Sequence, residues 1–256
     1  MTFHAKPPVA LSKKSRRTAL SKPYHIYPNI RMYWLYFKEE NHEYGFVTSY
    51  RKEQGMAQND LKKYQNKRHF EKTSEPSGKN CSKKSTSLFV IQKHDASQLH
   101  YDFRLQYQDV LLSWAVPKGL STAANEKRLA IRTENHPLDY ADFEGVIPEG
   151  EYGAGTVLVW DKGEYEPIIE EDEPEKTMEK ALKDGSLKFK LNGQKIQGGY
   201  AMARINTEQD REQWVIFKLD DDDADARRNP VHSEPDSVLT GRSLKDIGKE
   251  HNDEKH

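Results

Sequence analysis

The sequence predicts a mainly β domain, a barrel or a sandwich, with few helices. Between Leu88 and about Trp160, short runs rich in valine, isoleucine, leucine and aromatic residues are each bounded by turn residues, a pattern typical of all-β architectures. Residues 99–106, LHYDFRLQ, alternate strictly between apolar and polar side chains, which indicates a strand with two different faces. After a helix expected over Glu175–Asp184, three further strand-like runs follow Gly185.

The N-terminal part of the chain precedes this domain. Residues 1–55 mix prolines, basic residues and aromatic side chains without a helix or strand period, which predicts a disordered or mis-annotated extension, with Met56 as an alternative start. Residues 56–87 are expected to form a basic helix followed by an arm, the part over 71–87 being a flexible basic linker. Order is therefore expected to begin at Leu88.

The β domain is expected over residues 88–226. The helix over 175–184 reads as an insertion between strands because it is polar and ends before a glycine. Residues 227–256 lack a sustained helix or strand periodicity, so we expect a C-terminal tail with a short element near 239–247. The expected strands are 88–93, 99–106, 128–136, 186–191, 198–205 and 213–219.

Charge and cysteine content exclude several classes of protein. The 256 residues carry 40 Lys and Arg against 41 Asp and Glu, yet residues 1–84 hold 18 of the basic and only 7 of the acidic side chains. A basic end of this kind favours contact with nucleic-acid phosphates, although a solvated tail without a partner remains an alternative. With one cysteine, Cys81, and no apolar run longer than six residues, the sequence excludes a secreted disulfide scaffold and a membrane-spanning helix and indicates the cytoplasm.

Three side chains on two neighbouring strands could share a metal ion. His100 and Asp102 lie two residues apart on the polar face of one strand, so both point the same way. His94 closes the preceding strand, and the intervening turn would fold it back toward His100. Two imidazoles and one carboxylate form a three-ligand site with open coordination positions.

Further polar side chains could surround this metal site. Arg104 continues the polar face of residues 99–106, while a second alternating segment, 128–136, would place Arg128, Arg132, Glu134 and His136 on one face. If both strands close one barrel, these faces meet around a common cavity that suits an anionic phosphate, because guanidinium groups clamp phosphate and imidazole transfers protons. The alternative, that each polar face is merely exposed to solvent, stays open.

Longer motifs resemble those of one known family. The stretches FVIQKHDASQLHYDFRL, SWAVPKG, KRLAIRTENHPLDYADFEGVIPEGEYGAGTVLVWDKGEYEP and SVLTGR are similar, in family order, to the 3′-phosphoesterase domain of bacterial DNA ligase D. The resemblance spans about residues 61–247 and implies a compact closed β-barrel with a polar central cavity for metal and phosphate. Nothing resembles the ligase lysine motif or the polymerase carboxylate motif, so the chain is similar to a stand-alone version.

The resemblance also implies an activity and its partners. Members of the family trim a 3′-terminal ribonucleotide to a 3′-phosphate and then remove the phosphate, leaving a 3′-OH during DNA end joining. The implied cofactor is a divalent metal, foremost Mn²⁺, with Zn²⁺ or Co²⁺ as alternatives. The implied partners are DNA 3′ ends of primer-template or duplex, Ku, and a separately encoded ligase or polymerase, in a cytoplasmic, nucleoid-associated setting without a membrane.

Motif matching carries family roles onto individual residues. By resemblance, the metal ligands are His94, His100 and Asp102. The residues that contact the scissile phosphate are Arg104, His136 and Tyr140. Those that support the reaction are Lys118, Arg128 and Glu134. The two that match a segment used chiefly in ribonucleoside removal are Arg68 and Glu75.

One departure and two other classes of function bear on this interpretation. His69 stands where the family segment usually has aspartate, which predicts retained phosphomonoesterase activity and reduced ribonucleotide removal. Whether water attacks phosphorus directly or through a covalent phosphohistidine at His136 stays open. A non-haem iron oxygenase-like site is an alternative because His100, Asp102 and His136 imitate a 2-His-1-carboxylate triad. A non-catalytic nucleic-acid-binding β-barrel with a structural His/Asp set is the second.

Overall fold

The structure is a computed structural model that describes residues 61–78, 87–169, 177–206 and 212–253. The expectations for residues 1–55 and for Met56 lie outside this part of the chain. Among the helices described, none combines the length and the apolar character needed to cross a membrane.

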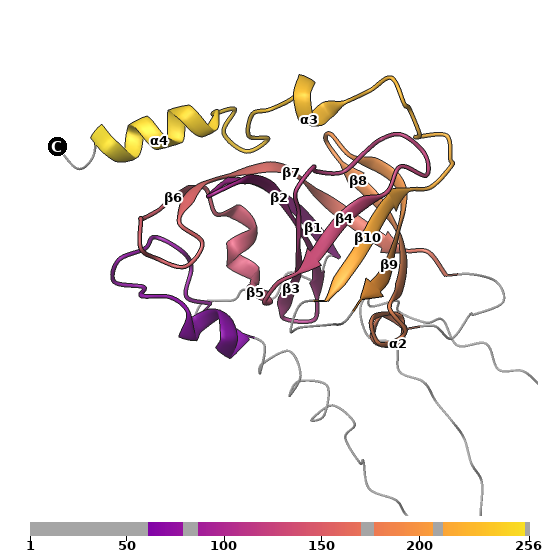
Figure 1. Ribbon diagram of the computed structural model, residues 1–256, viewed down its shortest axis with the longest axis horizontal. Coiled ribbons are helices and arrows are strands. Elements are labelled where there is room, and N and C mark those ends of the chain that lie inside the picture. Colours follow the sequence, from indigo (N-terminus) through magenta and orange to yellow (C-terminus); the bar gives the residue numbers. More distant parts are fainter. Residues whose placement is uncertain (1–60, 79–86, 170–176, 207–211, 254–256) are drawn as a thin grey trace, which may run out of the picture. The chain divides into compact units, whose positions relative to one another are not determined.

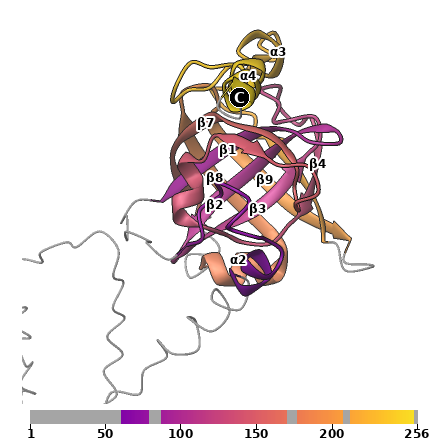
Figure 2. The ribbon, with the colours of Figure 1, turned by 90° about the vertical axis from the view of Figure 1, so that its left-hand side faces the viewer.

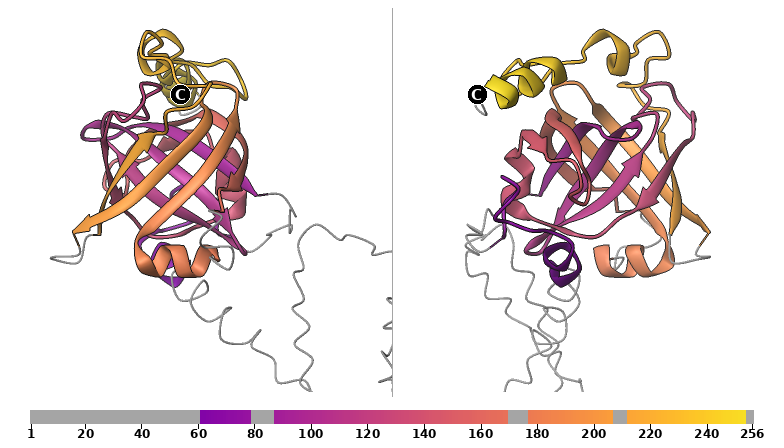
Figure 3. Two further views of the ribbon diagram at one scale, coloured as in Figure 1. Left: turned by 90° about the vertical axis from the view of Figure 1, so that its right-hand side faces the viewer. Right: turned by 60° about the vertical axis from the view of Figure 1, so that its left-hand side comes forward.

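Eight antiparallel strands close into a barrel, which confirms the predicted fold class (Figures 1 and 3). The order around the barrel is β1-β2-β3-β4-β10-β9-β8-β7, and pairing of β1 with β7 closes it. Two short strands join the sheet outside this ring, β5 beside β3 and β6 beside β7. The bounds are Leu88–Asp95 for β1, Leu99–Tyr107 for β2, Val110–Val116 for β3, Arg128–Arg132 for β4, His136–Pro137 for β5, Gly145–Ile147 for β6, Gly155–Pro167 for β7, Ser186–Gly193 for β8, Gln197–Asn206 for β9 and Gln213–Lys218 for β10.

Short helices connect or flank the strands. The predicted inserted helix is present as α2, Met178–Asp184, between β7 and β8. Thr177 caps its N-terminus by accepting from the Lys180 backbone N–H, and Gly185 ends it in the left-handed conformation. The others are the 3₁₀ helix η1, Leu138–Asp142, the helical residues 61–66, α3, Pro230–Ser233, and α4, Leu244–Asp253.

The C-terminal segment lies along the barrel rather than extending from it as a tail (Figure 1). Ile247 of α4 is 3% exposed and belongs to the main core. The buried carboxylate of Glu144 accepts from the hydroxyl groups of Ser237 and Thr240 and from the guanidinium of Arg242. These contacts fix the chain between α3 and α4 beside β7.

Apolar side chains fill the interior of the barrel, so the central position expected for the polar cavity is wrong. Alternate residues of all eight barrel strands form one buried cluster, in which Phe103 stacks on Phe189 at 5.7 Å and Trp114 meets Trp214 at 5.9 Å. An eight-stranded barrel is just wide enough to be filled by its own side chains, and unpaired charges inside it would be costly. Because side chains alternate, the polar faces of β1 and β2 point to the outside of the barrel.

A second layer covers these outward faces. The residues 61–78 and η1 pack there around a second apolar cluster that includes Tyr64, Val90 and Tyr140. The Tyr64 hydroxyl donates to the Pro76 carbonyl at 2.7 Å, and the Gln92 amide donates to the carbonyls of Tyr140 and Phe143, each at 3.0 Å. Order therefore begins before Leu88, and the expected flexible linker is wrong for residues 71–78.

Candidate active site

A polar cavity of about 210 Å³ lies between the outer face of the barrel and this covering layer. It brings together eight of the predicted site residues, Arg68, His94, His100, Asp102, Arg104, Glu134, His136 and Tyr140. Glu75 lies behind the lining, bonded to Arg68 and Tyr140. Lys118 and Arg128 do not line the cavity: Lys118 is exposed in the turn after β3, and Arg128 pairs with Glu126 at 2.9 Å.

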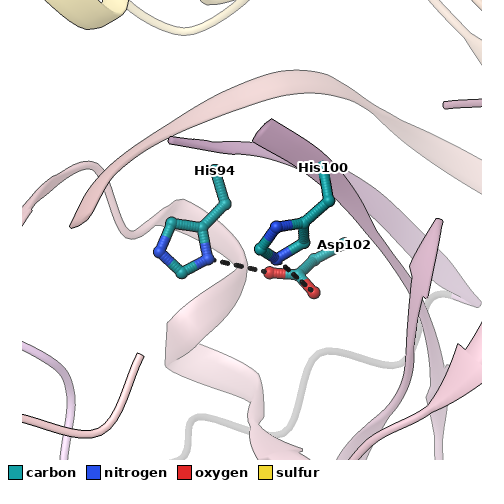
Figure 4. Close-up of side chains that lie close together, drawn as sticks. All are labelled: His94, His100 and Asp102. Carbon is teal, nitrogen blue, oxygen red and sulfur yellow. Dashed lines mark ion pairs between the residues drawn. The ribbon is translucent and has the colours of Figure 1, made fainter. Parts of the chain in front are cut away.

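The candidate metal ligands meet at the turn end of the β1–β2 hairpin (Figure 4). The strand register pairs His94 directly with His100, and Asp102 follows on the same face. One ligand atom from each of the three lies within 4.8 Å of the others. Asp102 Oδ2 is 3.6 Å from His94 Nδ1, and Asp102 Oδ1 is 3.8 Å from His100 Nε2.

The chemistry of this donor set fits a divalent transition metal. His100 Nδ1 lies 2.9 Å from the carbonyl of Gln98, an acceptor to which Nδ1 donates, and this contact leaves Nε2 on the side of Asp102 as the nitrogen available to a metal. In His94, Nε2 is buried without a hydrogen-bond partner. Two imidazole nitrogens and a carboxylate with room for further ligands suit Mn²⁺, Zn²⁺ or Co²⁺ by ligand type, and they do not distinguish among these metals.

Asp102 is held as a carboxylate. Burial by itself raises the pKa of Asp102, but the Arg104 guanidinium, aided by His94 and His100, outweighs burial and holds the pKa well below its usual range. Arg104 Nη2 donates to Asp102 Oδ2 at 3.2 Å. The ionised state is the one that binds a cation.

Arg104 is the central cation of the cavity, and buried polar side chains orient it. Its Nε donates to Gln92 Oε1 and its Nη1 to Ser113 Oγ, each at 2.8 Å, and the residue is only 2% exposed. Gln92 and Ser113 were missed in the sequence. The sequence signal that could have found them is a polar residue within an otherwise apolar strand. Such a side chain is buried and needs a hydrogen-bond partner.

His136 lies between two guanidinium groups. Its Nδ1 is 2.8 Å from Arg104 Nη1, and its Nε2 is 3.3 Å from Arg68 Nη2. Burial, together with the positive charges of Arg104 and Arg68, lowers the pKa of His136 well below its ordinary value, so the ring is neutral near pH 7. Because two cations face its nitrogens, His136 is poorly placed to bind a metal ion. The group that could hold a metal is completed by His94 instead, which disfavours the oxygenase-like triad.

Arg68 and Glu75 form a buried ion pair that ties residues 61–78 to the cavity. Arg68 Nε donates to Glu75 Oε1 at 2.9 Å, and the Tyr140 hydroxyl donates to the same oxygen at 3.1 Å. Burial, with the negative charge of Glu75, raises the pKa of Tyr140 well above its usual value. Tyr140 therefore keeps its proton and acts as a hydrogen-bond donor.

The segment predicted as one strand over 128–136 is interrupted. β4 ends at Arg132, the Thr133 N–H donates to the Ser113 carbonyl at 3.0 Å, and β5 begins at His136. Arg132 lies over the Trp114 ring at 4.9 Å and does not line the cavity, so the expected common face with His136 is wrong. The break is what turns Glu134 and His136 toward Arg68.

His69 does not line the cavity. Its side chain is 64% exposed, and its Nδ1 lies 2.8 Å from Glu151 Oε2 in the loop between β6 and β7. Of the neighbouring residues in this segment, Arg68 faces inward while His69 links the segment to that loop.

Comparison with known proteins identifies the domain. Residues 92–204 match the model of the DNA ligase D 3′-phosphoesterase domain. These residues belong to that family. The chain is 47% identical over 188 residues to the multifunctional non-homologous end joining protein LigD of Pseudomonas aeruginosa, covering 72% of this chain and 22% of that protein. It is 43% identical over 162 residues to the LigD of Mycobacterium bovis, covering 62% and 20%. The LigD of Mycolicibacterium smegmatis is 40% identical over 167 residues, covering 63% and 21%.

The chain spans about a fifth of the length of these relatives. Within the phosphoesterase domain, the metal-ligand candidates, Arg104, His136 and Tyr140 all fall inside the matched residues 92–204. Arg68 and Glu75 precede them, so Arg68 lines the cavity from outside the matched region, and Glu75 holds Arg68 from behind the lining.

Proposed function

We propose that this protein is a metal-dependent phosphoesterase that heals DNA 3′ ends, removing a 3′-phosphate to leave the 3′-OH required for end joining. One observation carries the proposal. Within a domain of the LigD 3′-phosphoesterase family, a His-His-Asp group, an ionic Arg104 and a neutral His136 converge on one cavity. This combination suits a phosphate dianion and a hydrolytic step.

Several residues that line the cavity have distinct proposed roles in the reaction. A divalent cation held by His94, His100 and Asp102 would supply Lewis acidity toward phosphate oxygens and water. Arg104 is positioned to donate to non-bridging phosphate oxygens, with its orientation fixed by Gln92 and Ser113. Neutral His136 can accept a proton, and the protonated Tyr140 hydroxyl can donate a hydrogen bond to the phosphate.

The roles of the remaining candidates are also proposals. Glu134 and Arg68 lie at the cavity wall and would orient His136 and the substrate. Lys118 and Arg128, exposed or paired outside the lining, would contribute at the periphery by contacting the DNA backbone. Direct attack by water and a covalent intermediate at His136 remain the two routes to be distinguished.

A direct assay tests the proposal. A 5′-labelled primer-template with a 3′-phosphate is incubated with the protein and Mn²⁺, beside an EDTA control and the His100→Ala variant. His232→Ala is the matched control because His232 is exposed in α3, outside the cavity. We expect conversion to 3′-OH by the wild type and His232→Ala only. If Mn²⁺, Zn²⁺ and Co²⁺ all fail to support conversion while DNA still binds in EDTA, the alternative of a non-catalytic nucleic-acid-binding β-barrel is favoured.

Ribonucleotide removal and partners extend the proposal. With His69 outside the cavity, we propose that trimming of a 3′-terminal ribonucleotide is slower than dephosphorylation, and equal rates on matched primers would contradict this. We also propose Ku and a separately encoded ligase or polymerase as partners at DNA ends, in a cytoplasmic, nucleoid-associated setting. Co-purification with Ku that depends on DNA ends would test this association.

A further inference from the structure

Tyr152, in the loop that joins β6 to β7, lines the cavity and is partly open to solvent, which places it at the cavity mouth. It is 48% exposed, although it contributes to the cavity lining. The other lining tyrosine, Tyr140, is 2% exposed and bonded inside the wall. Among the described residues that line the cavity, Tyr152 is therefore the tyrosine whose ring is open to an incoming ligand.

The position of this ring is fixed before any ligand arrives. The Tyr152 hydroxyl accepts from Lys67 Nζ at 3.1 Å and donates to Glu134 Oε2 at 3.4 Å. Lys67 Nζ also lies 4.2 Å from the ring centroid. The adjacent Glu151 binds His69 at 2.8 Å, which ties the same loop to residues 61–78 a second time. Figure 2 shows this indigo segment on the outside of the barrel. The Arg68 guanidinium also lies over the ring, with its Cζ 5.5 Å from the centroid. A ring held by these contacts and still 48% exposed loses little conformational entropy when something stacks on it.

The size of the cavity indicates what remains outside it. A volume of about 210 Å³ is below the about 300–1,000 Å³ typical of pockets that enclose a whole small-molecule ligand. The phosphate of a 3′ end would be directed inward by Arg104 and His136. The terminal nucleobase would then remain at the mouth, where the exposed aromatic ring stands.

Resting on the function proposed above, we propose that Tyr152 is the stacking platform for the terminal nucleobase of the DNA 3′ end. Stacking needs only the π-face that every base has, so this contact accepts any base. It gives the enzyme affinity for a nucleoside-bearing phosphate over a bare sugar phosphate without a sequence preference.

Two DNA probes separate stacking from phosphate binding. Both are primer-templates with a 3′-phosphate, and they differ only in whether the terminal deoxyribose carries 2-aminopurine or no base. The dissociation constant of each is measured by anisotropy in EDTA, and KM is measured with Mn²⁺. A stacked base is worth a factor of about 5 to 150 in affinity, so we expect the wild type to prefer the base-bearing probe by a factor in this range.

The variants decide the role of the ring. Tyr152→Leu should bring the preference close to one, whereas Tyr152→Phe should keep it, because the ring survives and only the hydroxyl contacts to Lys67 and Glu134 are lost. Quenching of 2-aminopurine fluorescence on binding should follow the same order. Equal loss on both probes in Tyr152→Leu, or no preference in the wild type, would overturn the proposal.

The outcome is separable from that of the proposed function. If the wild type hydrolyses neither probe, the phosphoesterase proposal fails, while the ratio of dissociation constants in EDTA still decides whether Tyr152 stacks on the base. If both probes are hydrolysed with equal KM and bound with equal affinity, the phosphoesterase proposal stands and the stacking platform is refuted.

Discussion

Replacement of Arg104 by methionine is the sharpest test of how the cavity is held together. Methionine keeps an unbranched apolar stem but is shorter and carries no charge and no N–H donor. The change removes the 3.2 Å contact to Asp102 and the two 2.8 Å contacts to Gln92 and Ser113. It therefore leaves a buried carboxylate without its main counter-ion.

The expected loss of stability follows from this geometry. Removing one partner of a buried ion pair typically costs about 3–5 kcal/mol. Two features place Arg104→Met near the lower end of that range. His94 and His100 lie within 3.8 Å of the Asp102 carboxylate and can partly compensate its charge, and the Ser113 hydroxyl keeps its bond to the Leu111 carbonyl at 3.0 Å. We expect the free energy of unfolding to fall by about 3 kcal/mol.

Urea unfolding in EDTA, followed by tryptophan fluorescence, measures this loss, because Trp114, Trp160 and Trp214 are buried in the barrel. The matched control is Arg132→Met in β4, which is separated from β2 by β3. The Arg132 guanidinium donates to the Ser113 and Thr133 carbonyls and does not line the cavity. We expect that control to lose about 1 kcal/mol.

Activity should separate the two variants further. If Arg104 stabilises charge on the phosphate, Arg104→Met should lower dephosphorylation by about 10²–10³-fold, and Arg132→Met should keep most of the activity. The reasoning would be refuted if Arg104→Met unfolded within 0.5 kcal/mol of the wild type, about the spread of neutral surface substitutions, and also hydrolysed substrate at the wild-type rate.

Three further predictions follow from the same contacts. Mn²⁺ at about 100 times its dissociation constant should stabilise the wild type by about 2.7 kcal/mol; His100→Ala should lose this gain in thermal unfolding, and a gain equal to that of the wild type would exclude His100 as a ligand. Burial and the charges of Arg104 and Arg68 lower the pKa of His136 in the folded protein. Below about pH 6.5, His136 is therefore protonated in the unfolded chain but not in the folded protein. As a result, the free energy of unfolding decreases with decreasing pH, by up to about 1.4 kcal/mol per pH unit. His136→Gln should lack this part of the slope between pH 7 and 5, whereas identical slopes would contradict it. Glu144→Gln should destabilise the protein by about 1–3 kcal/mol by weakening the bonds to Ser237, Thr240 and Arg242, and urea unfolding unchanged from wild type would show that these bonds contribute little.

The strand pattern and the metal group were predictable because both depend on local order. Period-two alternation in residues 99–106 marks the two faces of β2, and a short turn after His94 sets a register that places His94 opposite His100. No long-range information is needed to bring Asp102 beside them.

The break at Thr133 was not predictable from periodicity. Residues 128–136 alternate as a strand does, but the pairing of β4 with β10 ends at Ile131 and its pairing with β3 ends at Arg132. After the break, His136 pairs with Leu111, at the other end of β3 from the residues that pair with β4. Which partner a segment finds depends on the closed sheet and not on its own pattern.

The sequence by itself determined that this chain forms a mainly β domain, that His94, His100 and Asp102 share a face, and that its motifs belong with the 3′-phosphoesterases. Only the tertiary structure decided that this face is the outside of the barrel, that Arg68 and Glu75 close over it, and that Tyr152 stands at its mouth. Alternation defines two faces but not which one is interior. That choice is made when eight strands close and their apolar side chains fill the interior, leaving the charged face to be covered by segments distant in sequence.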